Sequence, residues 1–215
     1  MTLDKFKRRL KDFRKGVSID PSQFNDPLAL EVDWLPLAPG GANFKTKLLK
    51  KTNSYRYQFE PSVGALIFYW SFVLMGLGVT VWGYFSDESM ATIICGAIFA
   101  ILGAFMLTSQ TKPIIFDKGK GLFWIGKSQP RSRLVKQSKK QKSANIPDIH
   151  ALQILKEYCR GSNRSRGYYS YELNLVLKDA SRIHVIDHGK YDSLKQDSET
   201  LAEFLRVPIW NGARQ

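Results

Sequence analysis

The sequence predicts a membrane α-helical hairpin of two transmembrane helices joined to a small α+β domain. Two long uncharged runs carry the first half of this prediction. Short alternating segments after residue 111 carry the second half, because they are typical of antiparallel strands. The composition agrees, since the 215 residues are 44% hydrophobic and 24% charged, which excludes a disordered or disulfide-rich chain. The formal net charge is +13.

The uncharged runs cover 26 residues, 61–86, and 23 residues, 89–111. A helix rises 1.5 Å per residue, so about 20 apolar residues span the roughly 30 Å hydrocarbon core. We therefore predict a transmembrane hairpin over 61–111, with helices at about 63–85 and 90–110. Two buried helices in a soluble protein are the alternative, but the rest of the chain is too short to surround them. A cleaved signal peptide is excluded because the first run begins far from the N-terminus.

The charges on either side of the hairpin predict its orientation. The short connection carries only Asp87 and Glu88, whereas residues 1–60 hold 12 Lys and Arg and residues 112–215 hold 20. Positive residues near membrane helices stay in the cytoplasm. Both termini are therefore expected to be cytoplasmic, in a multi-pass protein of the inner (plasma) membrane.

Small residues in the second helix predict a close contact with another helix. The partner is either the first helix or another copy of the chain. Neither run contains a charged residue or a histidine, which disfavours a proton relay or a charged transport site. The predicted packing residues are Gly96, Ala100 and Ala104, with Gly76 and Gly83 in the first helix.

Residues 1–17 have apolar side chains spaced three and four apart, which predicts a basic amphipathic helix. Such a helix lies either on a membrane surface or against the protein's own domain. Residues 18–60 contain four prolines and a Gly-Gly pair, and we expect an irregular cytoplasmic segment there. The basic residues of the first segment with an expected lipid contact are Lys7, Arg8 and Arg9.

Residues 112–211 are expected to form a cytoplasmic β-rich domain with a C-terminal helix. Alternation and turn residues predict its strands, and Asp197 or Ser198 is the expected N-cap of the helix. The predicted strands are 113–117, 122–126, 148–159, 168–177 and 182–187, and the helix is 193–206.

Four stretches of this domain carry a structural resemblance: IIFDKGKGLFW, IHALQILKEY, SYELNLVLKDASRIHVIDHG and ETLAEFLRVPIWN. They resemble segments of uncharacterised bacterial membrane proteins that pair a transmembrane hairpin with a pleckstrin-homology-like domain. The resemblance covers roughly residues 60–211. It implies a curved antiparallel sheet capped by a helix, and a bacterial source, and it brings no catalytic residues.

Three histidines, His150, His184 and His188, are the candidates for a metal site, together with Asp187. The alternation places His184 and His188 on the face of their strand opposite Ile183. The alternative is that they are ordinary polar residues on a sheet. The two cysteines are too few for a disulfide or zinc framework, and no ordered catalytic motif accompanies the histidines. We expect no cofactor and no enzymatic activity.

A basic run over 127–142 contains no acidic residue and follows the second helix by about 15 residues. Lys and Arg near an anionic leaflet each gain about 1 kcal/mol, so the run is a candidate lipid-binding segment. The alternative is a solvated loop that only supports orientation. Nucleic acid is disfavoured because no aromatic residues interleave the run. The basic residues are Lys127, Arg131, Arg133, Lys136, Lys139, Lys140 and Lys142.

Together these features predict a non-enzymatic membrane scaffold or regulator whose cytoplasmic domain binds anionic lipid, a protein partner, or both. An immunity-type or accessory subunit, whose hairpin binds another membrane protein, is the main alternative. A homo-oligomer is compatible with either. A membrane-associated enzyme that uses the histidines is a third and less favoured hypothesis.

Overall fold

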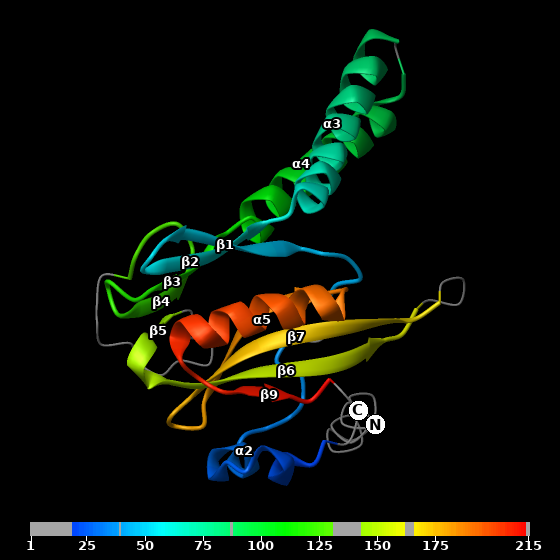
Figure 1. Cartoon of the computed structure of the whole chain (residues 1–215). Helices are drawn as coiled ribbons and strands as arrows, with labels where there is room; N and C mark the ends of the chain where they lie inside the picture. The colour runs from blue at the N-terminus through cyan, green and yellow to red at the C-terminus, as the bar shows by residue number, and fades with distance from the viewer. Residues whose placement is uncertain (1–18, 39, 87, 131–142, 162–165, 214–215) are drawn as a thin grey trace.

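The structure is a computed structural model, and it describes residues 19–38, 40–86, 88–130, 143–161 and 166–213. Two β-sheets and one long helix form the body, and a helical hairpin projects from it (Figure 1). The elements are η1 (Pro21–Phe24), α2 (Pro27–Glu31), β1 (Lys47–Asn53), β2 (Arg56–Pro61), α3 (Val63–Phe85), α4 (Met90–Gln110), β3 (Ile114–Asp117), β4 (Leu122–Ile125), β5 (Ser143–Asn145), η2 (Ile146–Asp148), β6 (Ile149–Cys159), β7 (Tyr168–Leu177), β8 (Arg182–His188), α5 (Tyr191–Leu205) and β9 (Ile209–Asn211).

The first sheet is an antiparallel meander of β1 to β5, and the helical hairpin is inserted between its second and third strands. Strand β2 pairs with β3 across this insertion, with Phe59 opposite Ile114 and Arg56 opposite Asp117. The Arg56 guanidinium forms a salt bridge to the Asp117 carboxylate at 2.5 Å. The expectation of an irregular segment over 18–60 is therefore wrong for residues 47–53 and 56–60, which form strands of the body, and Pro61, which was expected in the hairpin, ends β2.

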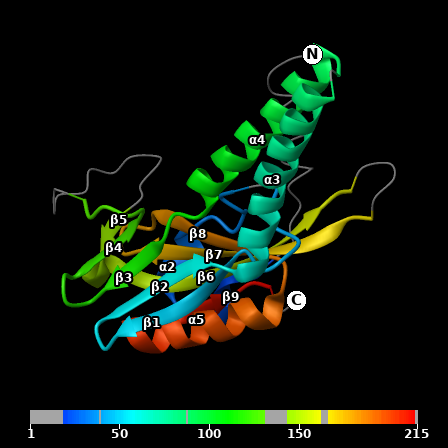
Figure 2. The ribbon, with the colours of Figure 1, turned by 90° about the horizontal axis from the view of Figure 1, so that it is seen from above.

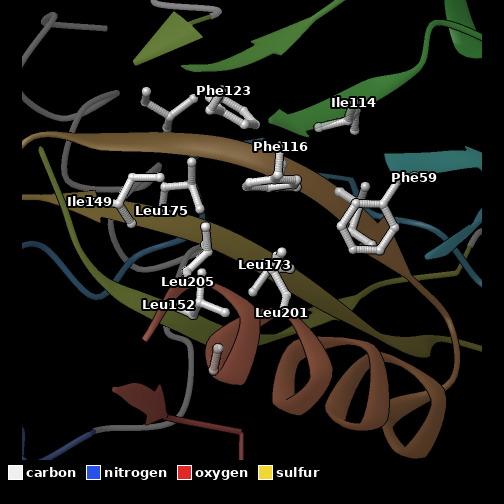
Figure 3. Close-up of a cluster of buried hydrophobic side chains, with 14 of the residues drawn as sticks. Phe59, Ile114, Phe116, Phe123, Ile149, Leu152, Leu173, Leu175, Leu201 and Leu205 are labelled. Atoms are coloured by element: carbon white, nitrogen blue, oxygen red, sulfur yellow. The ribbon is translucent and has the colours of Figure 1, made fainter. Parts of the chain in front are cut away.

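The second sheet has the order β8-β7-β6-β9, with β9 parallel to β6 and the other pairs antiparallel. Side chains from both sheets and from α5 meet in one apolar core (Figure 3). Phe59, Phe116 and Phe123 of the first sheet are fully buried there, as are Leu173 of β7 and Leu201 of α5. The predicted strands 113–117, 122–126, 148–159, 168–177 and 182–187 are confirmed.

Helix α5 begins earlier than the sequence predicted. Its N-cap is Lys190, which makes no side-chain capping bond. The expected caps lie inside the helix, where the buried Ser198 donates its hydroxyl to the Leu194 carbonyl and Asp197 accepts from the Leu49 N–H of β1. A serine can form its hydrogen bond inside a helix as well as at the N-cap. Its presence therefore did not mark the first turn of α5.

The opposite face of the second sheet is covered by the N-terminal part of the described chain. Trp34 stacks on Phe24 at 5.0 Å between ring centroids and packs against Trp210 of β9. The segment that follows, residues 33–38 and 40–42, is called the strap below. It crosses the sheet and is fixed by polar side chains that the sheet presents to its backbone.

Glu172 of β7 is the central anchor of the strap. Only 2% of this residue is exposed, and its carboxylate accepts the N–H groups of Leu37 and Ala38, both at 2.8 Å. The side-chain amide of Asn174 donates a third hydrogen bond at 2.6 Å. Beside this group, Arg182 donates to the Leu35 carbonyl at 3.0 Å. The buried Glu172 carboxylate is tolerated because the N–H groups of Leu37, Ala38 and Asn174 stabilise its charge.

The helices α3 and α4 are each long and apolar enough to cross a membrane. Their bounds coincide with the predicted spans of about 63–85 and 90–110. Ser62 caps the first helix by accepting the Ala65 N–H, and Ser89 caps the second by accepting the Thr92 N–H. Both helices project away from the sheets in the two views, and most of their large apolar side chains are exposed (Figures 1 and 2).

Glycines bring the two helices into backbone contact. If a Cβ atom were added at Gly96, it would lie 2.7 Å from the Thr80 backbone nitrogen and 2.9 Å from the Gly76 carbonyl oxygen. A Cβ atom added at Gly76 would overlap the backbone of Ala100. These separations are shorter than van der Waals contact, so only glycine permits this approach. Close packing through small residues is typical of helix pairs in membranes.

Two further glycines extend this contact toward the two ends. Gly83, a predicted packing residue, is buried, and a Cβ there would lie 3.2 Å from Ile93. Gly103, which the prediction omitted, is buried against Val73. Of the predicted packing residues in α4, Gly96 and Ala100 therefore lie at the contact, whereas Ala104 is exposed.

Candidate functional site

Of the basic residues predicted to contact lipid, the structure describes only Lys127. It follows β4 and is exposed. The others, Lys7, Arg8, Arg9, Arg131, Arg133, Lys136, Lys139, Lys140 and Lys142, lie outside the described residues.

The three histidines do not form one site. His150 pairs with the Asp26 carboxylate at 2.6 Å and lies beside Trp210. His184 contacts the Asp187 carboxylate at 3.1 Å. His188 is fully buried and accepts the Lys190 N–H at its Nδ1.

A β-bulge separates His184 from His188. Leu173 of β7 lies opposite Ile186, whereas the next residue, Asn174, lies opposite His184, so Val185 is an extra residue in β8. A bulge reverses the alternation beyond it. The prediction that both histidines share one face is therefore wrong: Val185 and Ile186 both enter the core, and His188 is buried on the side of Ile186.

One group of potential metal ligands does come together. Ligand atoms of Glu172, His184 and Asp187 all lie within 4.8 Å of one another. The Glu172 carboxylate, however, already accepts three N–H groups, and these donors would compete with a cation for its lone pairs. The geometry therefore favours a role for Glu172 in holding the strap over a role as a metal ligand.

A cavity of about 550 Å³ lies where the helical hairpin meets the body. The ends of α3 and α4, the segment from the strap to β1, and the edge strand β8 line it, together with single residues of β3, β4 and β7. Its apolar wall includes Phe44, Phe68, Met106 and Ile186. The polar and charged lining consists of Asn43, Thr46, Lys47, Ser109, Gln110, Lys112, Tyr168, His184 and Asp187, with the phenol of Tyr69 alongside.

Lys47 ties β1 to the end of α4 at this cavity. Its ammonium donates to the carbonyls of Gln110 at 2.9 Å and of Lys112 at 2.8 Å. The last carbonyls of a helix lack partners within the helix, so a cation there both bonds them and offsets the helix dipole. Burial lowers the pKa of Lys47 to about 8. Near neutral pH the ammonium therefore remains mostly charged.

His184 and Asp187 form a pair at the other side of the cavity. Burial opposes ionisation of His184, but its hydrogen bond to the Asp187 carboxylate and the charges of Asp187 and Glu172 outweigh it and raise the His184 pKa. On the other side of the cavity, Lys47 and Lys112 place two cationic groups in the lining.

Sequence reasoning did not find this cavity. Lys47 and Lys112 were counted only as signals of orientation, and 65 positions separate them along the chain. Their proximity follows from the pairing of β2 with β3, which the sequence pattern did not show.

His188 gives a testable pH dependence. Burial and the nearby charge of Lys45 lower its pKa to about 4, below the unfolded value near 6.5. The unfolded state therefore binds more protons between these values, and stability falls as the pH drops from 6.5 toward 4. From pH 6.5 to 4.5 we expect a loss of about 2–3 kcal/mol, or roughly 5–10 °C in melting temperature.

The measurement is thermal melting of the full chain in detergent at both pH values. His188→Asn keeps an acceptor for the Lys190 N–H and cannot ionise, so its melting temperature is expected to change less over this range than that of the wild type. His184→Asn is the matched control. Because the pKa of His184 is raised, its contribution to stability changes mainly above pH 6.5, so the melting temperature of this variant should depend on pH between 4.5 and 6.5 as that of the wild type does. Equal pH dependence in His188→Asn and in the wild type would contradict the assignment.

The interfacial cavity thus combines an apolar wall with a small number of cationic and hydrogen-bonding groups, a composition typical of ligand sites. No protein-family model matches the chain, and no curated protein matches it either.

Proposed function

We propose that this protein is an integral inner-membrane scaffold or regulator that holds its two-sheet body at the cytoplasmic surface, where the body binds anionic lipid and a protein partner. The observation that carries the proposal is the pair of long apolar helices inserted between β2 and β3. Because both ends of this hairpin continue directly into one sheet, insertion of the helices would hold the body directly against the bilayer.

The exposed side chains of the hairpin support insertion in a membrane. Val63 is 68% exposed, Leu74 63% and Phe105 67%, and these residues are distributed along both helices. A soluble protein rarely exposes an apolar patch of this extent, because it favours aggregation. In lipid the same side chains are solvated, and the helical backbone satisfies its own hydrogen bonds.

Lysines at the base of the hairpin support the cytoplasmic placement of the body. Lys47, Lys50 and Lys51 lie on β1, and Lys112 follows α4. The turn at the far end carries acidic residues instead. This asymmetry is the one by which membrane proteins are oriented.

We further propose that the body is pleckstrin-homology-like. Antiparallel strands followed by the C-terminal helix α5 are compatible with this architecture. Strand β9, which is parallel to β6, is an addition to it, and the helical hairpin is an insertion between two of its strands.

We propose a non-enzymatic role, in which the described histidines and Glu172 serve the fold. His150 and His184 are paired with carboxylates, and Glu172 holds the strap. The alternative of an accessory or immunity-type subunit is favoured by Trp70, which is 50% exposed on α3 close to the body, where it could pack on a partner's helix.

Cysteine labelling tests the placement. In a chain with Cys95 and Cys159 replaced by serine, a cysteine at Ser86 should react with a membrane-impermeant maleimide added to whole cells whose outer layers are permeable. A cysteine at Tyr55, in the turn between β1 and β2, is the matched control and should react only in inverted vesicles. Labelling of Tyr55→Cys from outside would overturn the proposed orientation.

Crosslinking in intact membranes then separates the scaffold from the accessory subunit. A photo-crosslinker at Trp70 that captures one membrane protein in stoichiometric amount would favour the accessory subunit. Capture of lipid or of a second copy alone would favour the scaffold.

A further inference from the structure

We propose that the cavity at the base of the hairpin binds the headgroup of one anionic phospholipid, with the phosphate held by Lys112 and Lys47. The inference rests on the proposed membrane placement. It goes beyond it by assigning the lipid contact to a defined cavity of the body, separate from the basic run over 127–142.

The position of the cavity favours a lipid. Its upper wall is formed by the ends of α3 and α4, and these ends would lie at the level of the headgroups if the helices span the bilayer. Phe68 of α3 and Met106 of α4 face the cavity, so its apolar wall continues the surface of the hairpin. An acyl chain can therefore follow the helices while its headgroup enters the cavity.

The charges favour an anion. Lys47 uses two of its three N–H groups on the carbonyls of Gln110 and Lys112, which leaves one donor for a ligand. Lys112 lines the same cavity and is exposed. Asp187 is the acidic residue in the lining, and its carboxylate pairs with His184 at 3.1 Å. Two ammonium groups therefore stand against one paired carboxylate, and this lining matches a phosphate diester.

Neutral polar groups complete the site. The Asn43 amide, from the segment that follows the strap, and the Ser109 hydroxyl of α4 line the cavity; the Ser109 hydroxyl donates to the Met106 carbonyl and so offers its oxygen as an acceptor. Headgroup hydroxyls, such as those of glycerol, are suited to these groups. The apolar wall distinguishes this ligand from a soluble phosphate ester, which would leave Phe44, Phe68 and Met106 in contact with water.

Native mass spectrometry of the full chain in detergent tests the proposal, with phosphatidylglycerol and phosphatidylcholine titrated separately. We expect one phosphatidylglycerol to bind about tenfold more tightly than phosphatidylcholine, which is the effect of one additional charge-assisted contact. Lys112→Gln should remove this preference. Ser109→Phe, which fills the cavity from the end of α4, should remove the bound lipid. Lys51→Gln, an exposed lysine on β1 outside the cavity, is the matched control and should bind as the wild type does.

Three outcomes would overturn the proposal: equal binding of the two lipids, an unchanged preference in both Lys112→Gln and Ser109→Phe, or a loss of preference in Lys51→Gln equal to that in Lys112→Gln. Glycerol 3-phosphate is titrated in parallel. If it binds as tightly as phosphatidylglycerol and displaces it, the ligand is a soluble phosphate ester and not a lipid. Failure of the membrane placement would appear in the labelling of Tyr55→Cys, independently of these titrations.

Discussion

Glu172→Ala is expected to lower the free energy of unfolding by about 3 kcal/mol or more. The substitution leaves the N–H groups of Leu37 and Ala38 and the Asn174 amide without their acceptor, and each buried donor without a partner costs about 1–3 kcal/mol. It also removes a negative charge close to the buried Arg182. The strap should detach before the body unfolds, because its backbone loses the anchor at its centre.

Limited proteolysis and thermal melting of the full chain measure these two effects. The strap region of Glu172→Ala should be cleaved under conditions that leave the wild type intact. Glu157→Gln is the matched control, because this carboxylate accepts the Gly40 N–H of the same strap at 3.3 Å from a more exposed position. Its cost should stay below about 1 kcal/mol. A cost for Glu172→Ala no greater than that of Glu157→Gln would refute the anchoring role.

Gly76→Leu is expected to separate the two helices of the hairpin. Any side chain at this position meets the backbone of Ala100 and the carbonyl of Gly96, and backbone cannot move aside as a side-chain terminus can. Overpacking of a tight contact costs roughly 1–3 kcal/mol, and we expect the upper end of this range here. The matched control is Gly78→Leu, because a Cβ at Gly78 meets no atom within 4 Å.

Chemical crosslinking across the hairpin reports this separation directly. A cysteine pair that replaces Phe72 of α3 and Phe99 of α4, whose rings stack at 6.1 Å between centroids, should be joined efficiently by a short bismaleimide in the parent chain and in Gly78→Leu, and poorly in Gly76→Leu. If Gly76→Leu instead lost only crosslinks between copies of the chain, the glycine face would serve association between molecules.

Local patterns in the sequence predicted the elements whose signals lie within a few residues of one another. The uncharged runs gave both helices, and alternation gave β3, β4, β6, β7 and β8. The same approach failed for β1, because its sequence KLLKKTN lacks alternation and its outer half is exposed. It also failed to predict which face of β8 carries His188. The bulge at Val185 reverses the alternation, and no residue pattern in the sequence indicates this bulge.

The candidate site was harder to predict for a different reason. Its residues come from several segments that are distant in sequence, and the pairing of β2 with β3 across the hairpin brings Lys47 close to Lys112. In the sequence, Lys47 is one of several lysines before the first helix. Only the structure shows that its ammonium donates to the carbonyls of Gln110 and Lys112 at the end of α4. The role of Glu172 in β7 was equally difficult to predict, because its partners in the strap lie more than 130 positions earlier in the sequence.

The insertion of the hairpin within one sheet has a consequence for biogenesis. During translation β1 and β2 emerge first, but β3, the strand that pairs with β2, follows only after both apolar helices. Until β3 has been synthesised, the edge of β2 stays open to other chains, and open edges promote aggregation. Under the proposed membrane placement, completion of the first sheet would therefore follow insertion of the hairpin.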